Sequence, residues 1–318
     1  MKRDFVSFQP YSSAELTAIL SLTQQLKSEH RPHVHPLLGK TAALIFEKPS
    51  LRTRVSFEVG IGQLGGQAVF LSQESIGMGS REAVRDVAEM LSGYCDLVVA
   101  RTLSHETVAG LADYGTVPVI NALTDLLHPC QILADAFTLM ERALLTPRTK
   151  IAFIGDGNNI VNSWVELAEK FPLHFVLACP PGYEPDQHIL ARTRSAGIST
   201  IEIVHDPFEA AEQADVLYTD VWVSMGQENE MMERRNAFKE YQISRPLLSA
   251  AKPDCVVMHC LPAHRGEEIA ADVLEGDHSI VRDQAINRLH VQNGIMTFLF
   301  TDGMQDSIKH QSVESLQA

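Results

Sequence analysis

Two arginines and two hydroxyl side chains crowd one short stretch of the chain, residues 50–54, which read Ser-Leu-Arg-Thr-Arg. An apolar run over 42–46 precedes this stretch, and Pro49 prevents a helix from running across the junction. Ser50 stands where a helix N-cap belongs, so free backbone N–H groups, the positive end of a helix dipole and arginine forks meet at one turn. These groups suit a phosphate. The alternative is an ordinary capped helix with solvated arginines.

Other polar side chains follow apolar runs further along the chain. Arg101 ends one such run, as either a second anion clamp or a surface charge. The sequence His-Pro-Cys-Gln at 128–131 opens a helix, and its imidazole and amide either hydrogen-bond a substrate carbonyl or only cap that helix. Cys260 ends another apolar run, where a lone cysteine is either part of the core or catalytic.

A glycine pair after a strand raises the question of a dinucleotide site. Gly155 and Gly157 fit the start of that fingerprint, but Ile160 occupies the place of its third glycine. Asn158 and Asn159, at the start of the following helix, suit a polar ligand such as an amino-acid carboxylate better.

Composition restricts the class of protein. A chain of 318 residues allows two domains, and a net charge of −14 argues against a nucleic-acid-binding surface. The five cysteines contain no C-x-x-C pair, which favours reduced thiols in a cytoplasm over disulfides or a structural zinc site. Histidines at 30, 33 and 35 lie in a proline-containing loop, and we expect no metal there. No apolar run approaches the length of a membrane span, so no membrane partner is expected.

The elements that would hold these side chains alternate between strand and helix twice along the chain. We expect strands over 41–46, 68–71, 96–100, 117–121, 150–154, 174–178, 200–204, 215–219 and 255–260. Among the helices we expect 13–29, 51–64, 128–144 and 282–300, and we expect a long polar loop over 223–235. The pattern predicts an α/β fold of two doubly wound domains with parallel sheets, joined by a long interdomain helix.

Taken together, the motifs resemble those of the transcarbamylase family over nearly the whole chain. Residues 50–54 are similar to the family's carbamoyl-phosphate motif, and 128–131 resemble its second motif. Two further segments, 220–226 and 259–262, resemble those of family members that use ornithine, and Arg288 matches a late arginine of the family. The resemblance implies a carbamoyl-phosphate-binding domain over 1–145, to which the last helix (about 284–318) packs back, and an ornithine-binding domain over 146–283.

The resemblance also implies an activity. The carbamoyl group of carbamoyl phosphate would pass to the δ-amine of L-ornithine through a tetrahedral intermediate, giving L-citrulline and phosphate with no metal or organic cofactor. Catalytic residues would be Arg52, Arg101, His128, Gln131, Cys260 and Arg288. Carbamoyl phosphate would bind to Ser50, Leu51, Arg52, Thr53, Arg101, His128, Pro129, Cys130, Gln131, Cys260, Leu261 and Arg288, and ornithine to Asn159, Asp220, Ser224 and Met225.

One departure from the family pattern concerns assembly. Members of the family form trimers, or multiples of trimers, in which a loop glutamine reaches a neighbouring subunit, and Gly77 stands at that position here. Met78, Ser80 or Arg81 could substitute for it.

Alternatives to this activity are a sister transcarbamylase that uses putrescine or N-acylated ornithine, an NAD(P)-dependent dehydrogenase, and a ligand-binding relative without catalysis.

Overall fold

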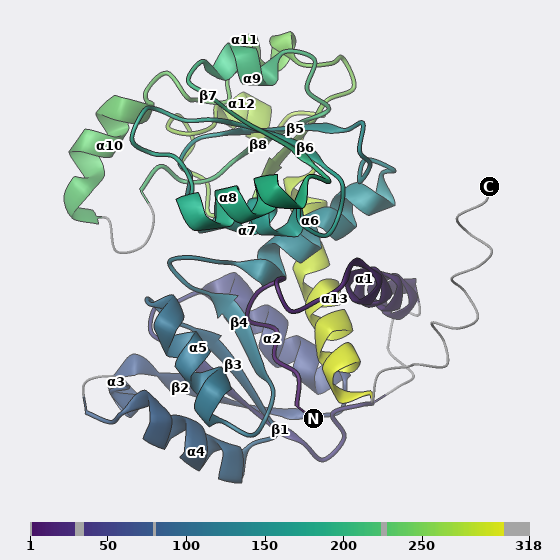
Figure 1. Ribbon diagram of the computed structural model, residues 1–318, viewed down its shortest axis with the longest axis vertical. Coiled ribbons are helices and arrows are strands. Elements are labelled where there is room, and N and C mark those ends of the chain that lie inside the picture. Colours follow the sequence, from purple (N-terminus) through teal and green to yellow (C-terminus); the bar gives the residue numbers. More distant parts are fainter. Residues whose placement is uncertain (1, 29–34, 79–80, 224–227, 302–318) are drawn as a thin grey trace. The chain divides into compact units, whose positions relative to one another are not determined.

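The computed structural model describes residues 2–28, 35–78, 81–223 and 228–301, and the chain within these ranges forms two compact units (Figure 1). Unit 1 contains the chain up to Val6, Pro10–Leu123 and the chain from Leu289 onward. Unit 2 contains Ser7–Gln9 and Thr124–Arg288. The helix α13, Val281–Phe300, therefore begins in unit 2 and ends in unit 1.

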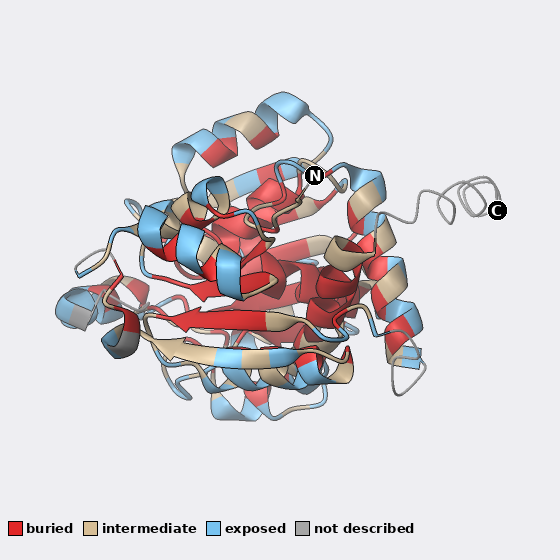
Figure 2. Ribbon diagram, turned by 90° about the horizontal axis from the view of Figure 1, so that it is seen from below, coloured by how far each residue is buried: buried red, intermediate tan, exposed pale blue. Residues whose placement is uncertain are grey.

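Unit 1 is built on a parallel sheet in the order β2-β1-β3-β4. Its strands are β1 (Thr41–Phe46), β2 (Gln67–Ser72), β3 (Leu97–Arg101) and β4 (Val119–Leu123). Its helices are α1 (Ser13–Ser28), α2 (Leu51–Gln63), α3 (Gln73–Ile76), α4 (Val84–Tyr94) and α5 (His105–Tyr114). Figure 2 shows inner strands in red, whereas the edge strand β2 alternates between exposed and half-buried residues, because it has a neighbour on one side only.

Helices cover both faces of this sheet. Apolar side chains of α4 and α5 pack with those of β1, β3 and β4 in one buried cluster. Two glycines allow the end of α13 to approach its neighbouring helices closely. A Cβ at Gly60 of α2 would lie 2.3 Å from Oδ1 of Asn293, and one at Gly294 would lie 2.1 Å from Oγ1 of Thr23.

Unit 2 is built on a second parallel sheet, in the order β7-β6-β5-β8-β9. Its strands are β5 (Lys150–Ile154), β6 (His174–Ala178), β7 (Thr200–Val204), β8 (Val216–Thr219) and β9 (Val256–His259). Its helices are α6 (Pro129–Glu141), α7 (Asn159–Leu167), α8 (Gln187–Ala196), α9 (Pro207–Ala211), α10 (Met231–Phe238), α11 (Arg245–Ala250) and α12 (Ala271–Leu274), with a 3₁₀ turn at Glu228–Glu230.

The helices of unit 2 also lie on both faces of its sheet. Figure 1 shows α6, α7 and α8 on one face and α9, α11 and α12 on the other. On the first face, Trp164 of α7 is fully buried and stacks on Phe175 of β6. On the second face, Phe238 and Tyr241 belong to a cluster with apolar residues of α9, α11 and α12. Each face thus has its own apolar layer, as a doubly wound sheet requires.

The predicted fold class is confirmed, since both sheets are parallel and helices cover both faces of each. The predicted loop over 223–235 is wrong in its last part, because α10 begins at Met231. That helix spans only eight residues, and Arg234 is one of its two buried residues, so its sequence shows no clear apolar period. Strand β4 lies two residues later than expected, at Val119–Leu123. The predicted domain limits remain a prediction.

None of the described helices has both the length and the apolar character that crossing a membrane would require.

Candidate active site

Several of the predicted site residues lie where parallel α/β sheets bind ligands, at the carboxyl ends of strands that flank a topological switch point. In unit 1 the switch point lies between β1 and β3, whose ends Phe46 and Arg101 are register partners. In unit 2 it lies between β5 and β8, which lead to the loop at 155–159 and to Asp220. Each unit therefore places one group of predicted residues at its own switch point.

The stretch at 50–54 folds as the sequence predicts. Ser50 is the N-cap of α2 in an extended conformation, and its hydroxyl oxygen accepts a hydrogen bond from the backbone N–H of Thr53. The same hydroxyl donates to Oγ1 of Thr53 at 3.0 Å. The first turn of α2 thus points its backbone N–H groups towards the carboxyl end of the sheet, as an anion site requires.

The two arginines of this turn differ in their surroundings. Arg54 donates from Nε to Glu58 at 2.9 Å, and its guanidinium lies 3.7 Å from the ring centroid of Phe70. Arg52 is half-buried and makes no ion pair or hydrogen bond within the part of the chain that the structure describes. Arg52 is therefore the arginine of this turn whose charge is available to a ligand. Arg101, at the end of β3, is 9% exposed, which rules out the solvated surface charge as its interpretation.

The backbone conformation at position 77 favours glycine. Gly77 caps α3 with φ 64°, and a Cβ there would lie 2.9 Å from the Cβ of Arg81. Met78 is buried in the apolar cluster of unit 1 and does not offer its side chain to a neighbour. Ser80 lies outside the described residues.

In unit 2, Asp220 is the centre of a polar cluster. Its Oδ1 accepts from the Cys260 thiol at 2.9 Å, and its Oδ2 accepts from Nδ2 of Asn158 at 3.0 Å. Asn158 also caps α7 through its Oδ1. The carboxylate, which is 9% exposed, is held between the ends of β5, β8 and β9.

The Cys260 thiol keeps its proton. Burial raises the pKa of this thiol well above its usual value, and the negative charge of Asp220 raises it further, whereas Arg288 lowers it to a smaller degree. In this arrangement the thiol is a hydrogen-bond donor to Asp220.

The residues around Cys260 have a fixed backbone. Leu261 has φ 59° and donates its N–H to Nδ1 of His259 at 2.9 Å. Nδ1 of His259 therefore carries the lone pair, and Nε2 carries the hydrogen that faces Glu268 at 3.0 Å. Both His259 and Glu268 are fully buried, so His259 positions the segment and does not face a substrate.

The helix α6 presents the motif at 128–131. Its N-cap is His128, whose side chain makes no capping hydrogen bond to the described residues of the helix, and whose N–H donates to Oγ of Ser163 at 2.7 Å. The capping interpretation of His128 is therefore wrong. Gln131 is 1% exposed, and its Nε2 donates to Asp135 at 2.9 Å. Burial raises the pKa of the Cys130 thiol to about 12.

The predicted ornithine residues are only partly described. Nδ2 of Asn159 donates to the carbonyl of Thr124 at 2.6 Å, which leaves one amide hydrogen for another acceptor. Ser224 and Met225 lie outside the described residues. The binding roles of these residues remain predictions.

Asp135 and Asp156 are among the buried ionisable residues of unit 2 that sequence reasoning missed. Asp135, one turn after Gln131, is fully buried, and burial raises its pKa to about 6. Asp156 pairs with Arg234 of α10 at 2.8 Å, and burial raises its pKa to about 6 as well, although Arg234 opposes the shift. A helical spacing of four from Gln131 could have drawn attention to Asp135; the partner of Asp156 lies 78 residues away and left no local signal.

Gly157 is also explained by packing. Its N–H donates to the carbonyl of Tyr183, and a Cβ would lie 2.5 Å from the backbone of Glu184. The glycine thus permits close approach of two loops, and no dinucleotide is needed to account for it.

Among the residues that the structure describes, three groups of side chains place potential metal ligands within 4.8 Å of one another: Cys179, Glu184 and His205; Asp220, His259 and Cys260; and His264, Glu267 and Glu268. In the second group, the thiol hydrogen of Cys260 and both ring nitrogens of His259 are already engaged in the hydrogen bonds described above.

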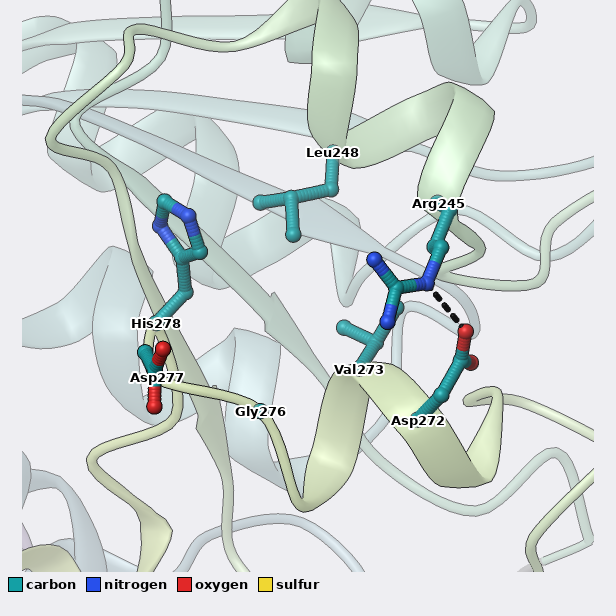
Figure 3. Close-up of a pocket in the computed structure, with 7 residues that line it drawn as sticks. All are labelled: Arg245, Leu248, Asp272, Val273, Gly276, Asp277 and His278. Atoms are coloured by element: carbon teal, nitrogen blue, oxygen red, sulfur yellow. Dashed lines mark hydrogen bonds and ion pairs between the residues drawn. The ribbon is translucent and has the colours of Figure 1, made fainter.

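A pocket of about 270 Å³ lies elsewhere in unit 2, between α11, α12 and the loop after α12 (Figure 3). Arg245 lines one side of it and pairs with Asp272, and Leu248 faces His278. None of the predicted site residues lines this pocket, and we assign no chemistry to it.

Known proteins resemble this chain over both units. The family model described as "Aspartate/ornithine carbamoyltransferase, carbamoyl-P binding domain" matches residues 3–141, and its companion, "Asp/Orn binding domain", matches residues 148–299. The ornithine carbamoyltransferase of Chlorobaculum tepidum is 53% identical over 94% of this chain and 90% of its own length. That of Syntrophus aciditrophicus is 50% identical over 94% of this chain and 100% of its own length.

Solved structures show the same likeness. The ornithine carbamoyltransferase of Pyrococcus furiosus superposes with a TM-score of 0.87 at 43% identity, covering 93% of this chain and 96% of that one. An N-acetyl-L-ornithine transcarbamylase superposes with a TM-score of 0.84 at 29% identity, covering 93% of this chain and 99% of that one. The fold is thus shared by enzymes with different amine acceptors. Because both family models match and the sequence identities reach half over most of its length, the chain belongs to the aspartate/ornithine carbamoyltransferase family.

Proposed function

We propose that this protein transfers the carbamoyl group of carbamoyl phosphate to the δ-amine of L-ornithine, giving L-citrulline and phosphate. The amine nitrogen forms a bond to the carbonyl carbon, the bond from that carbon to the phosphate oxygen breaks, and the amine loses a proton. Family membership supports the reaction class, and relatives named ornithine carbamoyltransferase at 53% and 50% identity support the acceptor.

The observation that carries the choice of acceptor is the Asp220 cluster. A carboxylate held between the Cys260 thiol and the Asn158 amide suits the α-ammonium group of a free amino acid. An aspartate acceptor carries a second carboxylate, which this buried negative charge would repel. N-acylated ornithine has no α-ammonium, and putrescine has no carboxylate for the proposed contacts at Asn159 and the Met225 backbone.

On the donor side, we assign the phosphate of carbamoyl phosphate to the turn at 50–54. The backbone of the first turn of α2 and the guanidinium of Arg52 supply donors and positive charge for it. Arg101 is proposed to contact both the phosphate and the carbonyl oxygen.

The carbonyl oxygen gains negative charge as the amine attacks. We propose that Arg101, His128 and the Thr53 hydroxyl donate to it, since preorganised donors of this kind contribute on the order of 3 kcal/mol each. Gln131 and the carbonyl of Leu261 would hold the carbamoyl nitrogen, and Arg288 would add a further donor.

The δ-amine must be neutral before it attacks, although a free alkylamine has a pKa near ~10. Cys260 does not receive its proton, because the raised pKa of the thiol keeps that sulfur protonated. The proton leaves with phosphate or to solvent.

An acceptor panel tests the proposal. Carbamoyl phosphate is supplied with L-ornithine, N-acetyl-L-ornithine, putrescine or L-aspartate, and kcat/KM is measured for each. We expect L-ornithine to exceed the others by at least about 100-fold, and Asp220→Asn to reduce that preference. A higher kcat/KM with any other acceptor would reassign the enzyme to a sister specificity.

We also propose that the chain forms a trimer, on the ground of its family, and that it is cytoplasmic, because all five cysteines are free thiols. Light scattering of the purified protein is expected to give three times the monomer mass of 35.2 kDa or a multiple of that, and a monomer would contradict the assembly. Fractionation of the source cells tests the location.

A further inference from the structure

One buried hydrogen-bond network in unit 2 links the start of α6 to the end of β9. Oδ1 of Asp135 accepts from Nε2 of Gln131 and from Nε2 of Gln284, each at 2.9 Å. Oδ2 of Asp135 accepts from the Tyr218 hydroxyl at 2.6 Å. Oε1 of Gln284 accepts the backbone N–H of His259 at 2.9 Å. All four side chains of this network are nine-tenths buried or more.

The orientation of each amide in the network is determined by its partners. Gln284 must turn its oxygen to the His259 N–H, so its NH₂ group faces Asp135. An ionised carboxylate only accepts hydrogen bonds, and therefore Gln131 must also turn its NH₂ group to Asp135. The oxygen of the Gln131 amide is then the atom that faces away from the network.

That oxygen has no partner of its own. Oε1 of Gln131 is buried and receives no hydrogen bond from any residue that the structure describes. A buried acceptor without a donor is unfavourable, and a bound N–H group would offset that cost. The site is therefore built to receive an N–H donor at this point.

We propose that Asp135 is a positioning residue, which holds the Gln131 amide so that its oxygen selects the NH₂ group of the donor substrate. This inference rests on the proposed function. Carbamoyl phosphate carries NH₂ on its carbonyl carbon, whereas acetyl phosphate carries CH₃ there and has the same carbonyl and phosphate. Asp135 thus acts through Gln131 to favour a carbamoyl over an acetyl donor, without touching either substrate.

The pH dependence of this selection follows from the carboxyl group. Below about pH 6 Asp135 is protonated, and its hydrogen can be donated to Oε1 of a flipped Gln131. Arg288 of α13 and Tyr218 of β8 also act on Asp135, and Cys260 after β9 lies within its electrostatic reach. The raised pKa values of Tyr218 and Cys260 keep both groups neutral in this range.

The test compares two constants, the KM for carbamoyl phosphate and the inhibition constant of acetyl phosphate against it. Their ratio measures selectivity for NH₂ over CH₃, and effects on phosphate binding cancel in it. In Asp135→Asn the neutral amide can offer either its oxygen or its nitrogen to Gln131, so the orientation is no longer enforced. We expect the selectivity to fall roughly tenfold, the loss of one hydrogen bond of about 1.4 kcal/mol.

Two further variants separate positioning from general stability. Thr138→Val removes a buried hydroxyl of the same helix, which accepts from Asn287 at 2.9 Å outside the network, and selectivity is expected to be unchanged. Tyr218→Phe leaves the bond between Gln131 and Asp135 in place but removes a donor that lowers the Asp135 pKa. It should therefore move the pH at which selectivity is lost upward.

Gln131→Met distinguishes failure of the inference from failure of the proposed function. If Gln131→Met lowers selectivity and Asp135→Asn does not, at pH 7.5 and pH 5 alike, the positioning role of Asp135 is overturned while the site stands. If Gln131→Met has no effect, Gln131 does not contact the carbamoyl nitrogen, and both the inference and that part of the proposed site are wrong.

Discussion

At the scale of single residues, the surroundings of a side chain decide its role more than its type does. Arg52 and Arg54 lie two positions apart on one helical turn. Arg54, however, already donates a hydrogen bond to Glu58 and lies over the ring of Phe70. Cys260 lies at the end of a buried strand, where a cysteine is either reactive or inert. Burial and the charge of Asp220 make it a protonated donor.

The two arginines provide a matched pair of variants. We expect Arg52→Ala to raise the KM for carbamoyl phosphate by about 100-fold, since a charge-assisted contact to phosphate contributes roughly 3 kcal/mol. Arg54→Ala should change that KM by less than about threefold, because it removes only a surface ion pair and a ring contact. Initial-rate kinetics with carbamoyl phosphate as the varied substrate decide the matter. Equal losses in both variants would contradict the assignment of the phosphate to Arg52.

Two substitutions distinguish a Cys260 thiol that donates a hydrogen bond from one that acts as a base. Cys260→Ser keeps a donor for Asp220, so the KM for ornithine is expected to stay within about threefold of the wild type. Cys260→Ala removes the donor and should raise that KM by roughly tenfold, the value of one hydrogen bond. Were Cys260 a base, the weakly basic serine would lose kcat as fully as alanine, and that result would overturn the donor role.

At the scale of elements, the two sheets explain why residues far apart in sequence meet. Asn158, Asp220 and Cys260 follow β5, β8 and β9, which are neighbours in one parallel sheet, so their side chains converge at its carboxyl edge. The helix α10 is tied to the same edge, because Arg234 contacts both Asp156 and the carbonyl of Trp222.

The pair of Arg234 and Asp156 gives a pH-dependent stability prediction. Burial raises the folded-state pKa of Asp156 to about 6, so Asp156 contributes more stability below its unfolded pKa near 3.8 and loses it as pH rises through 6. Arg234 opposes that loss above pH 6. Arg234→Met should therefore lower the free energy of unfolding by about 3–5 kcal/mol at pH 7.5 and by distinctly less at pH 5.

Urea unfolding at the two pH values measures this difference. Adding Asp156→Asn to Arg234→Met removes the buried charge, and the double variant is expected to recover most of the loss at pH 7.5. A loss of the same size at both pH values would mean that Arg234 acts by packing alone, for instance against Tyr183.

At the scale of the whole molecule, the alternation of strands and helices was enough to predict two doubly wound units. Buried parallel strands such as β3 and β9 are short apolar runs followed by polar residues, a pattern visible without any neighbour in space. The turn at 50–54 could be predicted for the same reason, since Pro49, Ser50 and the two arginines lie close together in the sequence. The short helices α11 and α12 were missed because each has too few turns to show an apolar period.

The contacts that the sequence could not reveal are long-range and polar. Asp135 meets Tyr218 and Gln284, which lie 83 and 149 residues away, and no periodicity connects such positions. Asn158 was recognised as a polar residue at a helix start, but its bond to Asp220 depends on the order of β5 and β8 in the sheet. Such polar pairings need the folded topology before they can be assigned.

The formation of citrulline tests the central claim most directly. The purified protein is supplied with carbamoyl phosphate and L-ornithine, and citrulline and phosphate are both quantified, with Arg52→Ala as the blank. We expect the two products in equal amounts and at a rate at least about 100-fold above the blank. Phosphate release without citrulline, or citrulline no faster than in the Arg52→Ala protein, would contradict carbamoyl transfer to ornithine at this site.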